Sequence, residues 1–185
     1  MVIWISGITA SGKTFLGKRL MNDLFQNEYN NVIHLDGDEL RRRPGWVSGH
    51  SLEDRFKVLD MLVELIIEEQ NKGKIVIVST VSHLKKMRDY ARERINNFNE
   101  IYLDCDALQC EKRDYKDFYK RAKLNSSTDA IYPGVTEKYQ KSAMPELTLF
   151  TGIEDSELSA EKLLSFTLNK INDIKKSKSR RLKVK

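Results

Sequence analysis

The chain has 185 residues and a formal net charge of +5, a length that suits one domain able to bury a hydrophobic core without disulfides or a structural metal. Apolar residues make up 40% of it and charged residues 32%, which excludes an intrinsically disordered chain. No apolar run reaches the roughly 18 residues of a membrane span, and the N-terminus lacks the pattern of a signal peptide, so we expect a cytoplasmic protein with no membrane partner.

Short apolar runs alternate with longer stretches of helical periodicity, which predicts βαβ units and a parallel sheet. The expected strands, in chain order, are Val2–Ser6, Val32–Leu35, Ile75–Ser79, Ile101–Asp104 and Leu147–Phe150. The expected helices are Phe15–Phe25, Leu52–Asn71, Leu84–Ile95, Ala107–Ala122 with a break near Asp114, and Ala160–Ile174. The predicted fold is therefore α/β, a three-layer α/β/α sandwich around a five-stranded parallel sheet.

A phosphate-binding motif follows the first expected strand. Residues 7–14 read Gly-Ile-Thr-Ala-Ser-Gly-Lys-Thr, which matches the P-loop pattern G-x-x-x-x-G-K-[ST]. Its glycines let backbone amides face the phosphates of a nucleotide at the start of the next helix. The residues expected to hold ATP are Gly7, Thr9, Ala10, Ser11, Gly12, Lys13 and Thr14. We expect the ammonium group of Lys13 to reach between the β- and γ-phosphates and the hydroxyl of Thr14 to bind Mg²⁺.

Two carboxylates follow the second strand, in Asp36-Gly37-Asp38. Ligands bind beyond the carboxyl ends of the strands in such sheets, so this pair is expected beside the P-loop. It can hold hydrated Mg²⁺ and accept a proton from an attacking hydroxyl; the alternative is an Asp-Gly turn with a helix cap at Asp38. Arg41 and Arg55 either grip an anionic substrate or form surface ion pairs.

A charged segment comes after the fourth strand. Six of the ten residues at 113–122 are charged, beginning with Arg113 and including Lys116. One interpretation is a solvated helix face. The other is a mobile cationic lid over about 113–136 that closes on the γ-phosphate, as a nucleotide kinase needs.

The basic charge of the chain is concentrated at its end. Residues 175–185 contain seven Lys or Arg and no acidic residue, which leaves 25 basic and 27 acidic residues, a net −2, for residues 1–174. A nucleic-acid-binding domain carries its positive charge on the folded body, so we expect no nucleic-acid partner. We expect a domain at 1–174 and a solvated, frayed tail at 175–185, a contact with anionic partners being the alternative.

In the order of its motifs, the chain resembles the adenylylsulfate (APS) kinase family over almost its whole length. The P-loop is followed by Leu-Asp-Gly-Asp at 35–38 with Arg41, and by Glu-Asp-Arg at 53–55. Then come a strand that ends in Ser79 with Ser82 after it, Arg-Asp-x-Lys at 113–116 and Pro-Glu-Leu at 145–147. The resemblance implies transfer of the γ-phosphate of MgATP to the 3′-hydroxyl of a small nucleotide by an enzyme that is usually a homodimer.

Roles for particular residues are also implied by the resemblance. Catalytic roles fall on Lys13, Asp36, Asp38 and Lys116, metal binding on Thr14 and Asp36, and contact with ATP on Arg113. The substrate-binding positions are Asp38, Arg41, His50, Arg55, Val58, Ser79, Val81, Ser82, Lys116 and Tyr132. Ser82 matches a serine that can itself become phosphorylated in some members of the family.

The acceptor pocket departs from the family pattern. His50 stands where a stacking Phe is usual, Val58 replaces an Asn, Tyr132 replaces another Phe, and His83 replaces a Pro. The acceptor is therefore expected to be adenylylsulfate (APS to PAPS) or another nucleotide diphosphate analogue such as cytidine diphosphoramidate. Two other classes stay open: a regulatory module that binds a nucleotide without turnover, and a nucleic-acid-binding protein that depends on the tail.

Overall fold

The computed structural model describes residues 1–114, 117–124 and 130–182. A parallel sheet of five strands forms the centre of the molecule, in the order β2-β3-β1-β4-β5. The strands are β1 (Val2–Ser6), β2 (Val32–Asp36), β3 (Ile75–Thr80), β4 (Phe98–Leu103) and β5 (Leu147–Leu149). All strand pairs are parallel, so the predicted α/β sandwich is confirmed.

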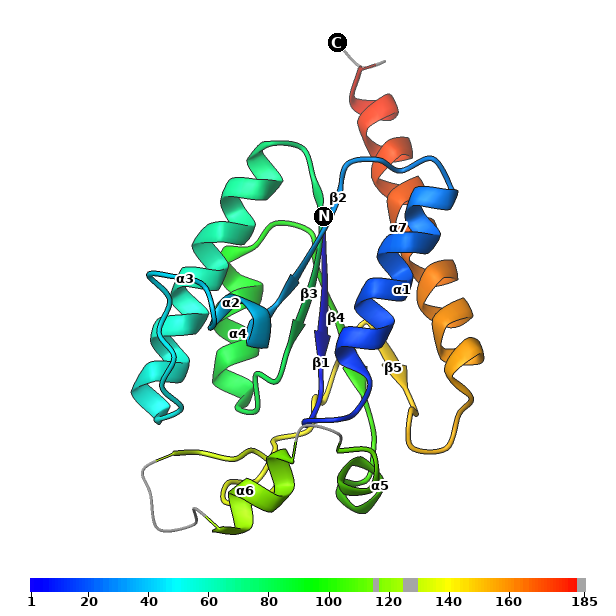
Figure 1. Ribbon diagram of the computed structural model, residues 1–185. Helices are drawn as coiled ribbons and strands as arrows, with labels where there is room; N and C mark the ends of the chain where they lie inside the picture. The colour runs from blue at the N-terminus through cyan, green and yellow to red at the C-terminus, as the bar shows by residue number, and fades with distance from the viewer. Residues whose placement is uncertain (115–116, 125–129, 183–185) are drawn as a thin grey trace.

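Helices cover both faces of this sheet. They are α1 (Lys13–Gln26), α2 (Gly37–Leu40), α3 (Leu52–Asn71), α4 (Lys85–Arg94), α5 (Ala107–Lys112), α6 (Phe118–Leu124) and α7 (Ser156–Leu182). Helices α1 and α7 lie on one face and α3 and α4 on the other, while α5 and α6 lie beyond the carboxyl ends of the strands (Figure 1). No helix among the described residues is long and apolar enough to cross a membrane.

Alternation along β1 divides the core into two layers. Val2 and Trp4 pack with the cluster under α3 and α4, whereas Ile3 and Ile5 pack with the cluster under α1 and α7. All five residues of β1 are buried, because a central parallel strand with helices on both sides has no solvent face.

Several elements differ in extent from the prediction, β4 among them. β4 begins at Phe98, three residues before the expected start, because its polar residues have partners in the core: Asn99 Nδ2 donates to the carbonyl of Val2 at 3.1 Å, and Glu100 pairs with Arg88. The break expected near Asp114 in the helix over 107–122 is confirmed: α5 and α6 are separate helices, and Asp114 accepts a hydrogen bond from the backbone amide of Tyr119 at 2.7 Å between them.

The expectation of a frayed tail is wrong for the residues that the structure describes. Helix α7 begins at Ser156 and continues through 175–182, so that the basic segment extends the helix past the body of the domain (Figure 1). At the start of this segment, Lys175 Nζ lies 3.3 Å from the hydroxyl of Tyr29 and over its ring. The tail is thus a continuation of the helix whose earlier turns pack on α1.

The register of the strands brings the motifs together at one edge. Ser6 at the end of β1 lies opposite Thr80 of β3, and Asp36 at the end of β2 lies opposite Ser79. The P-loop, the Asp36–Asp38 turn and the loop after β3 therefore leave the sheet side by side.

Candidate active site

The P-loop has the backbone shape that its glycines predict. Gly7 has φ +154°, and a Cβ atom there would lie 2.8 Å from Ser11 Oγ and 3.0 Å from the carbonyl oxygen of Leu103. Gly12, directly before α1, has φ +101° and has no side chain to cap the helix. The first amides of α1 are thus left to bind an anion at the positive end of the helix dipole.

Side chains from later segments hold the loop in place. Tyr119 of α6 donates from its hydroxyl to the carbonyl of Thr9 at 3.0 Å, and Thr151 Oγ1 donates to the carbonyl of Ser11 at 2.9 Å. Lys13 is buried and donates from Nζ to the carbonyl of Ile8 at 2.6 Å. The ammonium group is therefore folded into the loop that a nucleotide phosphate would fill.

Asp36 joins the P-loop to the second strand. Its Oδ2 accepts a hydrogen bond from Thr14 Oγ1 at 2.6 Å, and its Oδ1 accepts from the backbone amides of Asp38 at 2.9 Å and Glu39 at 3.2 Å. The N-cap of α2 is thus Asp36 and not Asp38, the position given for it in the sequence-based alternative. The same carboxylate that caps α2 also presents an oxygen beside the hydroxyl of Thr14.

The Thr14–Asp36 pair fits a magnesium ion. Mg²⁺ in nucleotide sites takes one or two protein oxygen ligands and fills its remaining positions with water and phosphate oxygens. Across residues 1–114, 117–124 and 130–182, no group of three or more His, Cys, Asp or Glu side chains could hold a metal ion by itself. The pair therefore suits an ion that arrives with a nucleotide rather than a structural metal.

Two arginines mark the other end of the site. Arg41 Nη1 donates to the carbonyl of Gly49 at 2.5 Å, and Arg55 Nη2 donates to the carbonyl of Ile131 at 2.5 Å. Burial, and then the neighbouring charge of Arg41, lower the pKa of Arg55 to about 10. Arg55 Nε is buried and has no hydrogen-bond partner among the described residues. Such partly desolvated cations favour an incoming anion.

Arg55 lies in the first turn of α3, which has a well-defined N-terminal cap. Ser51 Oγ accepts from the amide of Asp54 at 3.1 Å, and the Asp54 carboxylate accepts from the amide of Ser51 at 3.2 Å. These two hydrogen bonds form a capping box at the start of α3. One turn further along α3, the side chain of Val58 is 6% exposed, whereas His50, just before the cap, is exposed. Partial burial, followed by Arg41 and Arg55, lowers the pKa of His50.

A cavity of about 680 Å³ connects the two ends. Most of the predicted site residues line it: Thr9, Ala10, Gly12, Lys13, Thr14, Asp36, Asp38, Arg41, His50, Arg55, Val58, Ser79, Val81, Ser82, Arg113 and Tyr132. Gly7 and Ser11 shape the P-loop but do not line the cavity. Lys116 lies outside the described residues.

The hydroxyl of Ser79 forms hydrogen bonds with residues of the protein framework. Its hydroxyl donates to the carbonyl of Lys13 at 3.0 Å and lies 2.9 Å from His34 Nε2. The side chain is 3% exposed and ties β3 to the first turn of α1. Ser79, which the resemblance implies to be a substrate-binding position, thus lies at the cavity wall, and its hydroxyl is directed at the backbone of α1.

Several lining residues were not among the expected site residues, although some of them lie in the expected lid or acceptor pocket. They are Phe15, Gly37, Arg42, Ser48, Leu59, Leu62, Thr80, His83, Met87, Asp114, Phe118, Arg121 and Ile131. The aromatic ring of Phe118 lies 5.4 Å from that of Tyr132, edge to face. The helical periodicity of residues 52–71 could have placed Leu59 and Leu62 inward, but no sequence signal brings Phe118 to Tyr132.

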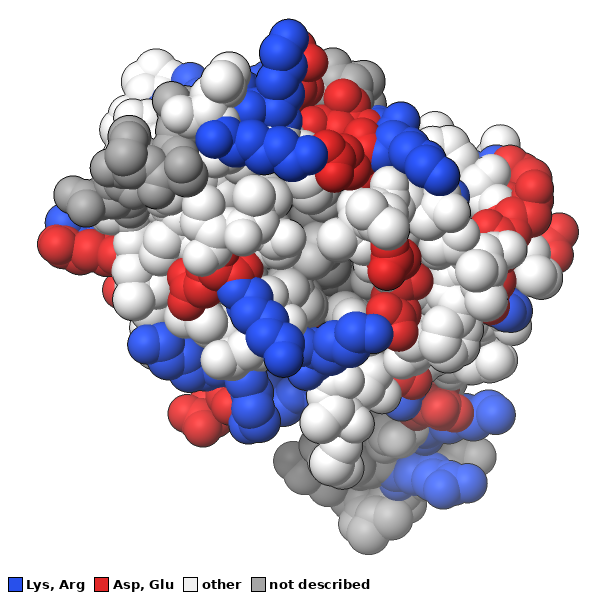
Figure 2. All heavy atoms as spheres, turned by 90° about the horizontal axis from the view of Figure 1, so that it is seen from below, with Lys and Arg blue, Asp and Glu red and all other residues white. Residues whose placement is uncertain are grey.

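The cavity carries an excess of positive charge. Six cationic side chains line it, namely Lys13, Arg41, Arg42, Arg55, Arg113 and Arg121, against three carboxylates, Asp36, Asp38 and Asp114. Seen from the carboxyl ends of the strands, a hollow in the surface has lysines and arginines along its rim, with acidic residues between them (Figure 2). This charge balance suits ligands that carry several phosphate or sulfate groups.

Comparisons with known proteins agree with this geometry. The sequence model of the family described as adenylylsulphate kinase matches residues 1–150. A probable adenylyl-sulfate kinase of Bacillus subtilis is 32% identical over 173 residues, covering 92% of this chain and 86% of the relative. A cytidine diphosphoramidate kinase of Campylobacter jejuni is 36% identical over 143 residues, covering 76% and 80%. The solved APS kinase CysC of Mycobacterium tuberculosis, in complex with AMPPNP and APS, superposes with a TM-score of 0.80 at 26% identity and covers 90% of this chain and 96% of that one.

Proposed function

The chain belongs to the adenylylsulphate kinase family of phosphotransferases, and we propose that it transfers the γ-phosphate of ATP to the 3′-hydroxyl of adenylylsulfate. The observation that carries the proposal is the single cavity that runs from the Thr14–Asp36 pair to Arg41 and Arg55. A similar solved structure holds an ATP analogue together with APS. A site with phosphate-binding groups at both of its ends supports two nucleotides that meet at the γ-phosphate.

The chain's own residues would divide the work as follows. The P-loop amides and Lys13 hold the β- and γ-phosphates and compensate their charge. Thr14 and Asp36 would hold Mg²⁺, which when bound neutralises charge on those phosphates. Arg113 would contact ATP. Lys116, by its position in the sequence, would belong to the lid.

We assign the role of proton acceptor to Asp38 by its place in the cavity. Asp36 lies beside Thr14 and caps α2, where it would hold Mg²⁺. Asp38 lines the cavity on the side of Arg41 and Arg55. A substrate hydroxyl placed between Asp38 and the γ-phosphate would lose its proton to Asp38 as it attacks in line.

Turnover with a defined acceptor tests the proposal. Purified protein with ATP, Mg²⁺ and APS should form ADP and 3′-phosphorylated APS in equal amounts, and omission of APS should stop ADP formation. If ATP binds but neither APS nor a cytidine diphosphate analogue is phosphorylated, a regulatory nucleotide-binding module replaces the enzyme. Salt-dependent binding of RNA or DNA that is lost on deletion of 175–185 would favour the nucleic-acid alternative.

A second acceptor is favoured by a specific observation. The cytidine diphosphoramidate kinase is 36% identical to the aligned part of this chain, and His50 and Tyr132 offer the acceptor less stacking area than two phenylalanines. A pyrimidine needs less of that area than adenine. We therefore propose a cytidine diphosphate analogue as the alternative acceptor, and comparison of kcat/KM for the two acceptors decides between them.

Assembly, domain extent and location are part of the same proposal. We propose a homodimer, a catalytic domain at 1–174 whose turnover does not need 175–185, and a cytoplasmic location, where ATP is available. Light scattering on the purified protein tests the dimer. A chain shortened to residue 174 keeps the buried Ile171 of α7 and should retain wild-type kcat.

A further inference from the structure

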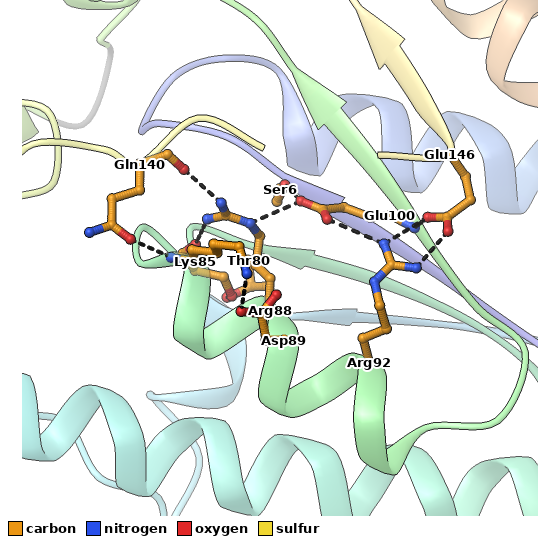
Figure 3. A network of polar contacts seen from close by, with 10 residues as sticks. Ser6, Thr80, Lys85, Arg88, Asp89, Arg92, Glu100, Gln140 and Glu146 are labelled. Carbon is orange, nitrogen blue, oxygen red and sulfur yellow. Dashed lines mark hydrogen bonds and ion pairs between the residues drawn. The ribbon is translucent and has the colours of Figure 1, made fainter. Parts of the chain in front are cut away.

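A buried arginine outside the cavity holds three segments together. Arg88 of α4 is 2% exposed. Its Nε lies 3.0 Å from Glu100 Oε1 of β4, its Nη1 donates to the carbonyl of Ser82 at 2.7 Å, and its Nη2 donates to the carbonyl of Gln140 at 2.6 Å. Figure 3 shows the guanidinium lying between the Gln140 segment and Glu100. Each of its three nitrogens thus serves a different segment of the chain.

The first of the two carbonyls belongs to a strained loop that faces the cavity. Ser82 has φ +38°, an unfavourable value for a residue with a side chain. Val81, Ser82 and His83 all line the cavity. Because a strained backbone persists only where its surroundings hold it, the bond from Arg88 is one of the contacts that keep this loop in shape.

The second carbonyl belongs to a segment that docks on the same loop. The amide of Gln140 donates to the carbonyl of His83 at 2.8 Å, and His83 Nε2 lies 3.0 Å from Glu137 Oε2. Residues 131–140 include Ile131 and Tyr132, which also line the cavity. Arg88 therefore bonds to both sides of the joint between the loop after β3 and this segment.

The ion pair with Glu100 is not the distinctive part of this arrangement. Glu100 also accepts from Ser6 Oγ at 3.2 Å and from Arg92 Nη2 at 3.4 Å, so it would keep partners if Arg88 were replaced. Buried ion pairs are in general weak contributors to stability and are better explained by the geometry that they impose. What Arg88 alone supplies is a planar fork with one donor for each of two carbonyls.

We propose that Arg88 is a positioning residue for the acceptor end of the cavity. By holding the carbonyls of Ser82 and Gln140 on one rigid guanidinium, it sets the position of Val81 and Ser82 relative to Tyr132. This inference rests on the proposed function, in which the acceptor nucleotide occupies that end. ATP binds at the P-loop, and Arg88 contacts no P-loop residue among its described hydrogen bonds and ion pairs.

Three variants test the proposal. Arg88→Met removes the fork, and Arg88→Lys keeps a positive charge near Glu100 but has a single ammonium group that cannot serve all three partners. Arg92→Met is the matched control, since Arg92 lies one turn along α4 and pairs with Glu100 and with Glu146, at 2.5 Å for its Nη1, but contacts neither loop. Arg88→Met and Arg92→Met each remove a buried or half-buried ion pair, whereas Arg88→Lys keeps a cation for Glu100 and loses only the fork.

In both Arg88 variants, the KM for the acceptor should rise about tenfold to a hundredfold, because a small misplacement of groups around a substrate has effects of that size. The KM for ATP should stay within about threefold of wild type, since the contacts that bind ATP at the P-loop are unchanged. The control should lower the melting temperature while leaving the acceptor KM unchanged. An unchanged acceptor KM in Arg88→Lys, or an equal rise in Arg92→Met, would overturn the proposal.

Hydrogen exchange separates this proposal from the proposed function. The amide of Gln140, which donates to His83, should exchange faster in Arg88→Met and Arg88→Lys than in wild type, and at the wild-type rate in Arg92→Met. A wild-type protein that phosphorylates no acceptor refutes the proposed function, and the exchange rates still test Arg88. Equal exchange in all four proteins refutes the positioning role, whatever the activity.

Discussion

Thr14 and Asp36 are 22 residues apart in the chain, yet their side-chain oxygens lie 2.6 Å from each other. The first residue belongs to the opening turn of α1 and the second ends β2. Parallel pairing of β2 with β3, and of β3 with β1, brings the end of β2 and the P-loop after β1 to the same edge of the sheet. The contact joins the P-loop to the turn that leads towards Arg41 at the other end of the cavity.

Replacement of the P-loop lysine should nearly abolish turnover. In Lys13→Ala, charge on the β- and γ-phosphates loses its buried ammonium partner, and groups that stabilise transition-state charge in this way contribute about a hundredfold or more to kcat. Steady-state ADP formation measures the loss, with circular dichroism as the control for folding. Turnover within about threefold of wild type would contradict the role given to Lys13.

Replacement of Asp36 and replacement of Asp38 should have different kinetic effects. Asp38→Asn should lower kcat by about a hundredfold or more, the usual contribution of a general base, with little change in ATP affinity measured by calorimetry. Asp36→Asn should also raise the Mg²⁺ concentration needed for half-maximal rate, because a neutral amide replaces the carboxylate oxygen beside Thr14. Unchanged kcat in both variants would reduce Asp36-Gly37-Asp38 to a turn.

The acceptor pocket predicts a gain of function. His50→Phe restores a larger stacking surface and, combined with Val58→Asn, should raise kcat/KM for APS by roughly tenfold, within the range of one base-stacking contact. Val58 is 6% exposed, so an asparagine there also costs stability unless its amide finds partners. The single His50→Phe variant therefore serves as the control. If wild type ignores APS and phosphorylates a cytidine diphosphate analogue, the altered positions define specificity for the other acceptor.

The histidines predict how stability depends on pH. Burial is the largest cause that lowers the pKa values of His34 and His83 in the folded chain. The unfolded chain, with pKa values of about 6.5, therefore binds more protons than the folded chain just below that pH. Stability should be complete above about pH 6.5 and should decline as the pH falls below it.

Melting temperatures between pH 5 and 8 test this dependence. The decline should begin in the histidine range, well above the range in which exposed carboxylates titrate. His34→Gln keeps a side-chain donor that can reach Ser79 Oγ, the partner of His34 at 2.9 Å, but does not titrate, so its profile should be flatter. A melting temperature that is constant from pH 7.5 to 5.5 would rule out the effect.

The identity of the elements could be predicted from local pattern. Apolar runs and helical periodicity located the five strands and most helices, and the bounds of β1 and α3 agree with the expectation. Polar residues hid the start of one strand: Asn99 and Glu100 stand before the predicted strand but lie in β4, where tertiary partners satisfy them. The charged tail likewise looked frayed, although α7 continues through it to Leu182.

The sequence by itself determined the phosphate-binding end of this protein, because a P-loop is a local object: its glycines, its lysine and the helix that follows are neighbours in the chain. Only the tertiary structure decided how the acceptor end is built. Arg55 reaches the carbonyl of Ile131, and Arg88 binds the carbonyls of Ser82 and Gln140. Contacts across such separations depend on how strands and helices pack, and packing is a property of the whole core rather than of any local pattern.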